Sequence, residues 1–220
     1  SQRIVHSTAW DAFPALSPDG RHIAFLSDRT GVPNLWIAAG DGSRASMAAE
    51  IEGVLWAPPI WSPDGSFIVF ADKTLRLMMV DAVTGEATEV DRGDYDDAWY
   101  RWGIQEFVVS PDSAWIAYTK VEDSLNDSIY LYQIATGERT RVTGHETKDW
   151  SPSFSLDGKY LYFAASTNSG PVQIGLNMTS QERPYRAAIY AMVLASDGKS
   201  PLLPDSGDET TESEEEGEKD

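Results

Sequence analysis

Short runs of alternating hydrophobic and polar residues follow one another along the chain, and one arrangement of them recurs four times. Each copy is centred on Ser-Pro-Asp-Gly or a close variant, beginning at Ser17, Ser62, Ser110 and Ser155, with spacings of 45, 48 and 45 residues. Apolar residues stand one position before the serine and six and eight positions after it: Leu16, Trp61, Val109 and Phe154; Ile23, Ile68, Ile116 and Leu161; Phe25, Phe70, Tyr118 and Phe163. A repeat of this period indicates that each copy folds as one structural unit.

Each copy predicts four short antiparallel strands. The first runs into Pro-Asp-Gly, where Pro presets φ and Gly accepts a positive φ, so a tight turn leads directly into the second strand, as at 22–26. Third strands are expected at 34–38, 75–80, 129–134 and 189–194, and fourth strands at 87–90 and 139–142. These segments are rich in β-branched and aromatic residues, and no stretch keeps helical spacing. Four strands in about 45 residues are typical of a β-propeller blade. The alternative is a β-sandwich whose turns coincide by chance.

We therefore expect an all-β chain of four four-stranded antiparallel blades, belonging to a larger propeller. Residues 1–7 match a fourth strand, which predicts that they are the outer strand of a preceding blade. The expected blades span 8–50, 51–97, 98–149 and 150–204, with a long insertion at 164–188, and an acidic disordered linker follows at 205–220. That linker carries nine acidic residues and one lysine and has no aromatic or aliphatic side chain with which to form a core.

Composition narrows the possible functions. Hydrophobic residues make up 41% of the 220 residues, enough for a folded core, and no cysteine is present, which excludes disulfides and thiol nucleophiles. The formal net charge of −18 disfavours nucleic-acid binding, because such a chain repels phosphates. No apolar run is long enough to cross a membrane and no signal peptide is recognisable. We expect a cytoplasmic protein, with the periplasm as the alternative.

The repeats resemble those of three groups of propeller proteins: TolB, the dipeptidyl and prolyl peptidases, and the tricorn-type proteases. Three features favour the tricorn-type proteases. Residues 61–65 lead into a segment, 80–86, that is similar to a strand and turn of their second propeller. Residues 154–163, followed by the insertion, resemble its last blade. Residues 200–204, followed by the acidic run, look like the exit towards the protease half.

This resemblance implies a non-catalytic propeller segment of a serine peptidase that guides or filters peptides and supports assembly. In tricorn-type proteases the catalytic residues lie beyond the propellers, so no catalytic residue is assigned here, and no cofactor or metal is expected. The implied partners are peptides or unfolded polypeptides and other subunits of the same protein, with no nucleic acid and no membrane. The alternative is a stand-alone TolB-like scaffold that binds another protein.

Topology indicates where recognition would occur. In a blade, the loops from fourth to first strands and from second to third strands emerge on one face, and variable loops on a rigid scaffold commonly carry recognition. The candidate peptide- or partner-binding residues on this loop face are Trp10, Asp11, Arg101, Trp102, Asp149, Trp150, Arg183 and Arg186. Asp91, Asp94, Asp96 and Asp97 also cluster there, but they lack the order of a calcium loop and are interpreted as a solvated loop.

Overall fold

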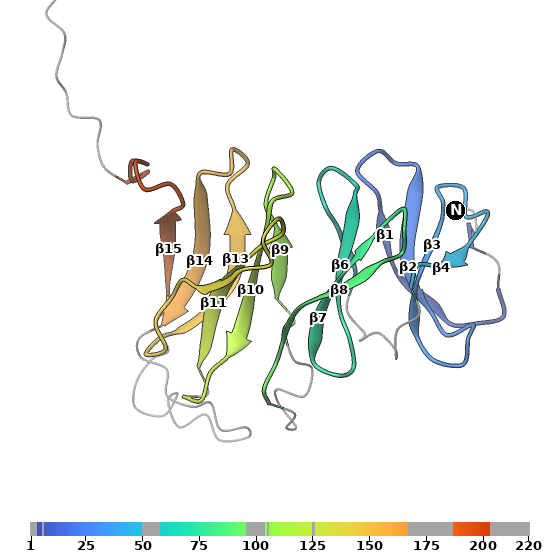
Figure 1. The fold of residues 1–220 in the computed structure, drawn as a ribbon, viewed down its shortest axis with the longest axis horizontal. Coiled ribbons are helices and arrows are strands. Elements are labelled where there is room, and N and C mark those ends of the chain that lie inside the picture. The colour runs from blue at the N-terminus through green and yellow to red at the C-terminus, as the bar shows by residue number, and fades with distance from the viewer. Residues whose placement is uncertain are drawn as a thin grey trace, which may run out of the picture.

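The computed structural model describes residues 4–5, 7–49, 58–95, 104, 106–124, 126–166 and 187–202 of the chain. Every regular element in these residues is a β-strand, and the strands form four antiparallel sheets. The sheets lie side by side in chain order, from β1–β4 at one end to β13–β15 at the other (Figure 1). The expected all-β, blade-like architecture is confirmed.

Strand bounds follow the repeat. The first sheet contains β1 (Asp11–Leu16), β2 (His22–Ser27), β3 (Asn34–Ala39) and β4 (Ser46–Met47). The second contains β5 (Ile60–Trp61), β6 (Phe67–Ala71), β7 (Arg76–Asp81) and β8 (Ala87–Arg92). The third contains β9 (Phe107–Val109), β10 (Trp115–Val121), β11 (Asp127–Gln133) and β12 (Arg139–Arg141). The fourth contains β13 (Lys148–Phe154), β14 (Tyr160–Ser166) and β15 (Ala188–Val193).

The fourth sheet differs from the sequence-based expectation in three ways. It has three strands rather than four among the described residues. Its first strand begins at Lys148, two residues ahead of the position where the last blade is expected to begin, because Lys148 and Asp149 pair with Ser166 and Ala165. For the same reason β14 extends to Ser166, so the first three residues of the expected insertion belong to a strand. The rest of that insertion, up to residue 186, and the acidic segment 205–220 lie outside the described residues.

The Pro-Asp-Gly turns take the predicted form. The amide of Gly20 donates to the carbonyl of Ser17 over 2.9 Å, and Gly20 has a φ of 71°, a region that costs other residues energy. In the third repeat Ser113 replaces this glycine and still adopts a φ of 58°. The turn geometry therefore belongs to the repeat as a whole, because the flanking strands enforce it even where the sequence is less suitable.

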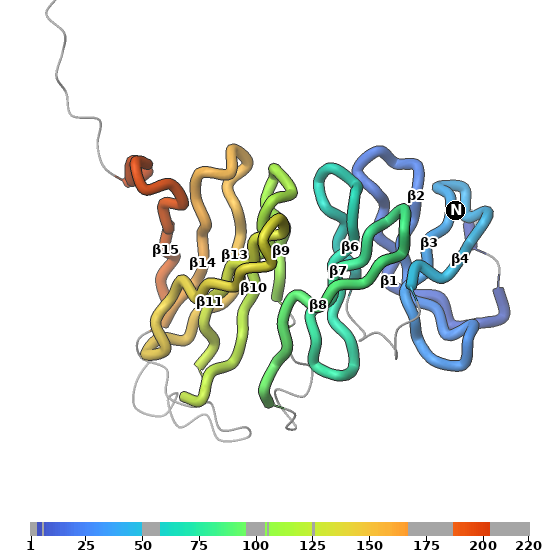
Figure 2. The backbone as a smooth tube through the Cα atoms, in the orientation of Figure 1, coloured from blue at the N-terminus to red at the C-terminus, as the bar shows by residue number. Residues whose placement is uncertain are grey.

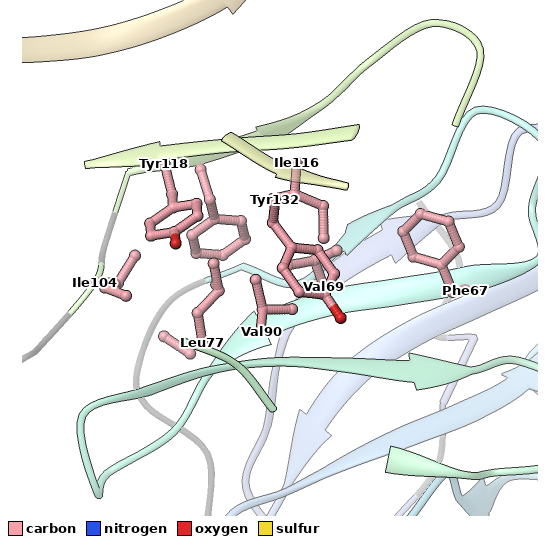
Figure 3. Close-up of a cluster of buried hydrophobic side chains, with 10 residues drawn as sticks. Phe67, Val69, Leu77, Val90, Ile104, Ile116, Tyr118 and Tyr132 are labelled. Atoms are coloured by element: carbon pink, nitrogen blue, oxygen red, sulfur yellow. The ribbon is translucent and has the colours of Figure 1, made fainter. Parts of the chain in front are cut away.

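The hydrophobic core lies between neighbouring sheets. In the two central sheets, alternate residues of the second strand face opposite neighbours: Phe67, Val69 and Ala71 face the third sheet while Ile68 and Phe70 face the first. Figure 3 shows the cluster between the second and third sheets, where Leu77 and Val90 meet the chain around Tyr118. A smaller cluster joins the third and fourth sheets through Ala117, Ile129, Leu161, Phe163 and Ala165. The cores between neighbouring sheets thus depend on residues from two sheets.

The large residues that recur after each anchor serine face the same way in successive sheets. The residues six and eight positions after each anchor serine, such as Ile116 and Tyr118, face the preceding sheet in the second, third and fourth sheets. In the first sheet the equivalent Ile23 and Phe25 pack with Val5, Trp36 and Ala45 instead.

First strands form the contacts between sheets at one edge. β5 contacts both β1 and β9, and β13 contacts β9, β10 and β11. The tube in Figure 2 follows this order along the row of sheets. The first strands of adjacent sheets therefore lie next to one another.

Candidate functional site

The anchor serines have a structural role in every repeat. The hydroxyl of Ser17 donates to the carboxylate of Asp19 over 2.6 Å and accepts the backbone amide of His22 over 2.9 Å. Both bonds recur at Ser62, Ser110 and Ser155, with hydroxyl-to-carboxylate distances of 2.6, 2.5 and 2.6 Å and amide-to-hydroxyl distances of 3.1, 2.9 and 3.0 Å. Each serine thus closes its turn, and its aspartate partner is held in the same turn because it also accepts a backbone amide there.

Asp11, one of the candidate binding residues, is already paired within the first sheet. Its carboxylate accepts Arg29 Nη2 over 3.1 Å and a bond from the hydroxyl of Ser7. The Arg29 guanidinium also lies over the rings of Phe25 and Trp36, 5.2 and 5.0 Å from their centroids. Burial raises the pKa of Asp11, but the Ser7 bond and the Arg29 charge outweigh it, so the pKa stays below its ordinary 3.8. Asp11 is therefore an ionised carboxylate with its cation supplied by the chain.

Trp10 is held by packing beside this pair. Its backbone amide donates to the carboxylate of Asp28 over 2.9 Å, and its ring meets the ring of Phe13 edge-on, with centroids 6.1 Å apart. The side chain packs against the core between the first and second sheets. These contacts indicate that Trp10 serves to pack the sheets at the loop face.

Asp149 is the equivalent residue of the fourth sheet and is buried differently. It stands six positions before Ser155, as Asp11 stands six before Ser17, and both strands carry a register shift and a positive φ two residues later, at Phe13 and Ser151. Only 1% of Asp149 is exposed. Its Oδ2 accepts the hydroxyl of Thr147 over 3.0 Å, but its Oδ1 is buried with no hydrogen-bond partner.

Other charged groups surround Asp149. Lys148 Nζ lies 3.3 Å from Asp127 Oδ2, and Glu106 accepts the backbone amide of Ser151 over 2.6 Å. Burial raises the pKa of Asp127, the Lys148 ammonium opposes this rise, and the charges of Glu106 and Asp149 add to it. The region therefore holds three carboxylates against the single ammonium of Lys148 among the described residues, at the loop end of the third and fourth sheets.

The expectation that the four aspartates between positions 91 and 97 form a solvated loop is wrong for Asp91. Asp91 is 6% exposed, and its carboxylate accepts the hydroxyl of Tyr118 over 2.8 Å. Lys120 Nζ lies 3.5 Å and Arg139 Nη1 3.7 Å from the same carboxylate, while Lys120 also reaches Asp94 at 3.2 Å. Burial and the charge of Asp91 raise the pKa of Tyr118 far above its ordinary value of 10.0. The carboxylate of Asp91, in the second sheet, is thus bound by side chains of the third sheet.

The candidate residues do not meet as one cluster in the described structure. Trp10 and Asp11 belong to the first sheet, while Asp149 and Trp150 belong to β13 of the last, and two sheets separate them (Figure 1). Trp150 is half-buried and pairs with Ala164 of β14. The remaining candidates, Arg101, Trp102, Arg183 and Arg186, lie outside the described residues, as do Asp96 and Asp97.

Sequence reasoning missed Arg29, Glu106, Asp127 and Lys148. One signal could have found the main relationship: aligning the repeats on their serines places Asp11 and Asp149 at the same position. The charges around them come from neighbouring sheets and from the loop between β2 and β3, and spacing within one repeat does not reveal such partners.

Hollows are found elsewhere on the molecule. One of about 490 Å³ lies on the turn side between the first two sheets, lined by residues that include His22 and Trp61, whose ring centroids are 6.5 Å apart. Another of about 420 Å³ lies against Ile23 and Phe25 on the outward face of the first sheet. Among the described residues, no group of three or more histidine and acidic side chains is arranged to hold a metal ion. The described part of the chain also contains no helix of the length and apolarity needed to cross a bilayer.

Comparison with known families gives one match that covers residues 10–220, the tricorn protease second beta propeller domain. A curated relative, Tricorn protease homolog 1 of Streptomyces coelicolor, is 30% identical over 163 residues, which are 72% of this chain. The chain spans only 14% of the length of that relative.

Two solved structures resemble the fold. The crystal structure of the tricorn protease matches 85% of this chain and 18% of its own, with a TM-score of 0.68 and 21% identity. TolB from Acinetobacter baumannii matches 87% of this chain and 45% of its own, with a TM-score of 0.56 and 19% identity. At these identities, the structural matches establish the propeller fold alone.

Proposed function

Because the chain belongs to the tricorn protease second β-propeller domain family, we propose that it is a non-catalytic segment of a tricorn-like serine peptidase that guides or filters peptides. The observation that carries this proposal is the arrangement of the first strands, in which β5 contacts β1 and β9, and β9 contacts β13. A peptide moving past the sheets would meet this row of adjacent first strands and the connections that enter them, and such connections commonly carry recognition. The four anchor serines support a non-catalytic role, because the hydroxyl of each is hydrogen-bonded within its own turn.

A role in assembly is the second part of the proposal. On the last sheet, Ile189 is 81% and Tyr190 46% exposed, which leaves apolar surface on its third strand. Apolar surface of this kind favours contact with another part of the protein or with another subunit. The partners proposed are therefore peptides on the loop face and other subunits of the same protein.

The experiment replaces residues 172–186 with a short Gly-Ser linker in the whole protein. If the loop face selects peptides, turnover of long peptides should fall while turnover of a short fluorogenic peptide is kept. The matched control is Val83→Ser, which changes a 92% exposed residue on the turn side. Unchanged oligomer size together with unchanged turnover of both substrates would remove this segment from the proposal.

The alternative is a stand-alone propeller scaffold, which the structural match to TolB favours at the level of fold. The full reading frame separates the two proposals. A PDZ-like segment and a serine-peptidase domain after residue 220 would support the peptidase, whereas a stop codon directly after Asp220 would favour the scaffold.

A further inference from the structure

A groove crosses the junction between the first and second sheets on the turn side of the molecule. The hollow of about 490 Å³ that holds His22 and Trp61 shares several lining residues, among them His22, Ile37 and Ala82, with a second hollow of about 600 Å³. Volumes of this size are typical of ligand pockets. The turns that follow the first strands lie along the same edge of the row of sheets (Figure 1). The groove therefore opens on the face opposite the connections between second and third strands.

A polar ring at one position of the repeat keeps this junction open. Five positions after the anchor serine, the later repeats carry Phe67, Trp115 and Tyr160, whereas the first repeat carries His22. Phe67 is 6% exposed and packs in the core between the second and third sheets. His22 is exposed instead, with its ring centroid 6.5 Å from that of Trp61. The indole of Trp61 is fixed, because its Nε1 donates to a backbone carbonyl of β1 over 3.0 Å. The hollow thus has a fixed indole in its wall and an exposed imidazole beside it.

Two ionised aspartates stand at the rim of the smaller hollow. Asp19 and Asp64, one from each turn, line it and are exposed. Hydrogen bonds hold the pKa of both carboxyl groups below the ordinary 3.8: the bond from Ser17 is the main cause at Asp19, and at Asp64 burial opposes the turn bonds without cancelling them. The turn bonds go to Oδ1 of each aspartate, which leaves Oδ2 for a ligand. Arg21 Nε lies 3.8 Å from Asp19 Oδ2, but this pair is exposed and contributes little.

This combination fits a cation carried on an aliphatic stem. Methylene groups pack well on apolar surface while their charged end stays at the water-exposed rim, and an aromatic ring attracts a cation further. Among the described residues, these acids and His22 are not arranged to hold a metal ion. The second hollow extends the groove past Ile37 to Arg21 and Arg44, so the groove is longer than a single amine needs. The net charge of −18 also favours encounters with a basic partner.

We propose that this turn-side groove binds a segment of a partner polypeptide, with a lysine or arginine side chain in the hollow at Asp19 and Asp64. The stem of that side chain packs against Trp61 and Ile37, and its cation pairs with the two carboxylates. The segment continues over the second hollow, where Arg44 favours an acidic residue. Because the groove lies on the face opposite the loop face, the site is separate from the peptide-guiding function and stands if that function fails.

The test measures binding to the whole protein by equilibrium dialysis, and mass spectrometry counts the intact ligand so that cleaved peptide does not contribute. The probes are an acetylated heptapeptide amide with one lysine and one glutamate among alanines, the same peptide with norleucine for lysine, and Nα-acetyl-lysine amide. Norleucine keeps the aliphatic stem and removes the ammonium. We expect the lysine peptide to bind about fivefold more tightly than the norleucine peptide, as two exposed ion pairs allow. Equal affinities of the two peptides would overturn the site. Binding of Nα-acetyl-lysine amide as tight as that of the lysine peptide would overturn the assignment to a polypeptide.

A pair of matched variants locates the binding in the groove. Asp64→Asn keeps an oxygen that accepts the turn bonds and removes the charge, so the preference for lysine over norleucine should fall to about twofold or less. Asp157→Asn is the control, because Asp157 has the same place and the same bonds in the turn of the fourth sheet, and it should keep the preference. Both variants are compared below their unfolding temperatures. A preference that survives in Asp64→Asn, or that falls equally in both variants, would overturn the proposal. Peptide turnover is not a readout, so the result does not depend on the peptide-guiding function.

Discussion

The hydroxyl of Tyr118 donates a hydrogen bond of 2.8 Å to the carboxylate of Asp91, and the two residues belong to different sheets. Tyr118 is completely buried and its ring stacks on that of Tyr130, with centroids 5.6 Å apart. The contact between the second and third sheets is thus fixed by a polar bond in addition to apolar packing. Hydrogen bonds depend on direction as well as distance, so this one adds a geometric constraint between β8 and β10.

Tyr118→Phe should weaken this junction. The substitution keeps the ring and removes the donor to a buried carboxylate, which is expected to cost about 1–3 kcal/mol of local stability. Hydrogen exchange of amides in β8 and β10 should accelerate accordingly. Tyr160→Phe is the control, because its hydroxyl bonds to the carbonyl of Lys199 at an exposed site, and it should change exchange little. Equal exchange in both variants would contradict a structural role for the Tyr118 bond.

Ser62→Ala tests whether the anchor serine serves structure alone. Ser62 is fully buried and makes two bonds, to Asp64 and from the amide of Phe67. Losing them should cost about 1–3 kcal/mol, which a lower unfolding temperature would report. Below that temperature, peptide turnover by the whole protein should keep its rate. A loss of turnover without a loss of stability would show that the serine takes part in the chemistry.

Gly85→Ala should destabilise the chain more than Gly158→Ala. Both glycines have a φ near 70°, so both substitutions incur the strain of about 1 kcal/mol or more that a side chain meets in this region. At Gly85 the new Cβ would also lie 2.6 Å from the carbonyl oxygen of Ala48 in the neighbouring sheet, whereas nothing lies within 4 Å at Gly158. Unfolding temperatures of the two variants measure the difference. Equal temperatures would mean that the turn at Gly85 moves away from Ala48 without cost.

Acid should weaken the anchor turns. The hydroxyl of Ser17 and the amide of Arg21 donate to Asp19 and hold its pKa below the ordinary 3.8. Since the folded-state pKa is the lower one, this stabilisation is present above pH 3.8 and is lost as the pH falls through the folded-state pKa. In Ser17→Ala the pKa of Asp19 should rise towards 3.8, and NMR titration of the carboxyl carbon would measure the change. An unchanged pKa would show that the Ser17 bond contributes nothing.

The strands could be predicted because the signals for them are local. The expected segments 34–38 and 87–90 appear as β3 at Asn34–Ala39 and β8 at Ala87–Arg92, since alternation and turn residues lie within a few positions of each strand. The division of the chain into blades at the stated boundaries, and the assignment of residues 1–7 to a preceding blade, stay predictions.

The polar contacts could not be predicted in the same way. Asp91 looked like one of four solvated acids because its partner, Tyr118, is 27 residues away and in another sheet. Asp149 was selected as a residue of the loop face, but its burial follows from the strand pairing with Ala165 and from the neighbouring third sheet. Local sequence gives the residue type, and packing between sheets decides whether that residue meets water or another side chain.

The constant direction of the large residues six and eight positions after each serine has a consequence for how such chains grow and associate. Each sheet joins its neighbour through unlike surfaces, back to front, so the contact is heterologous. A heterologous series stops only when its two ends meet in a ring, and otherwise it adds units indefinitely, as a fibre does. In the first sheet, Ile23 and Phe25 are the large residues at these two positions. They lie on the surface that joins the preceding sheet in the other repeats. Duplicating one repeat therefore lengthens the series and uses the same interface again. Closure of the ring is what prevents such a protein from polymerising.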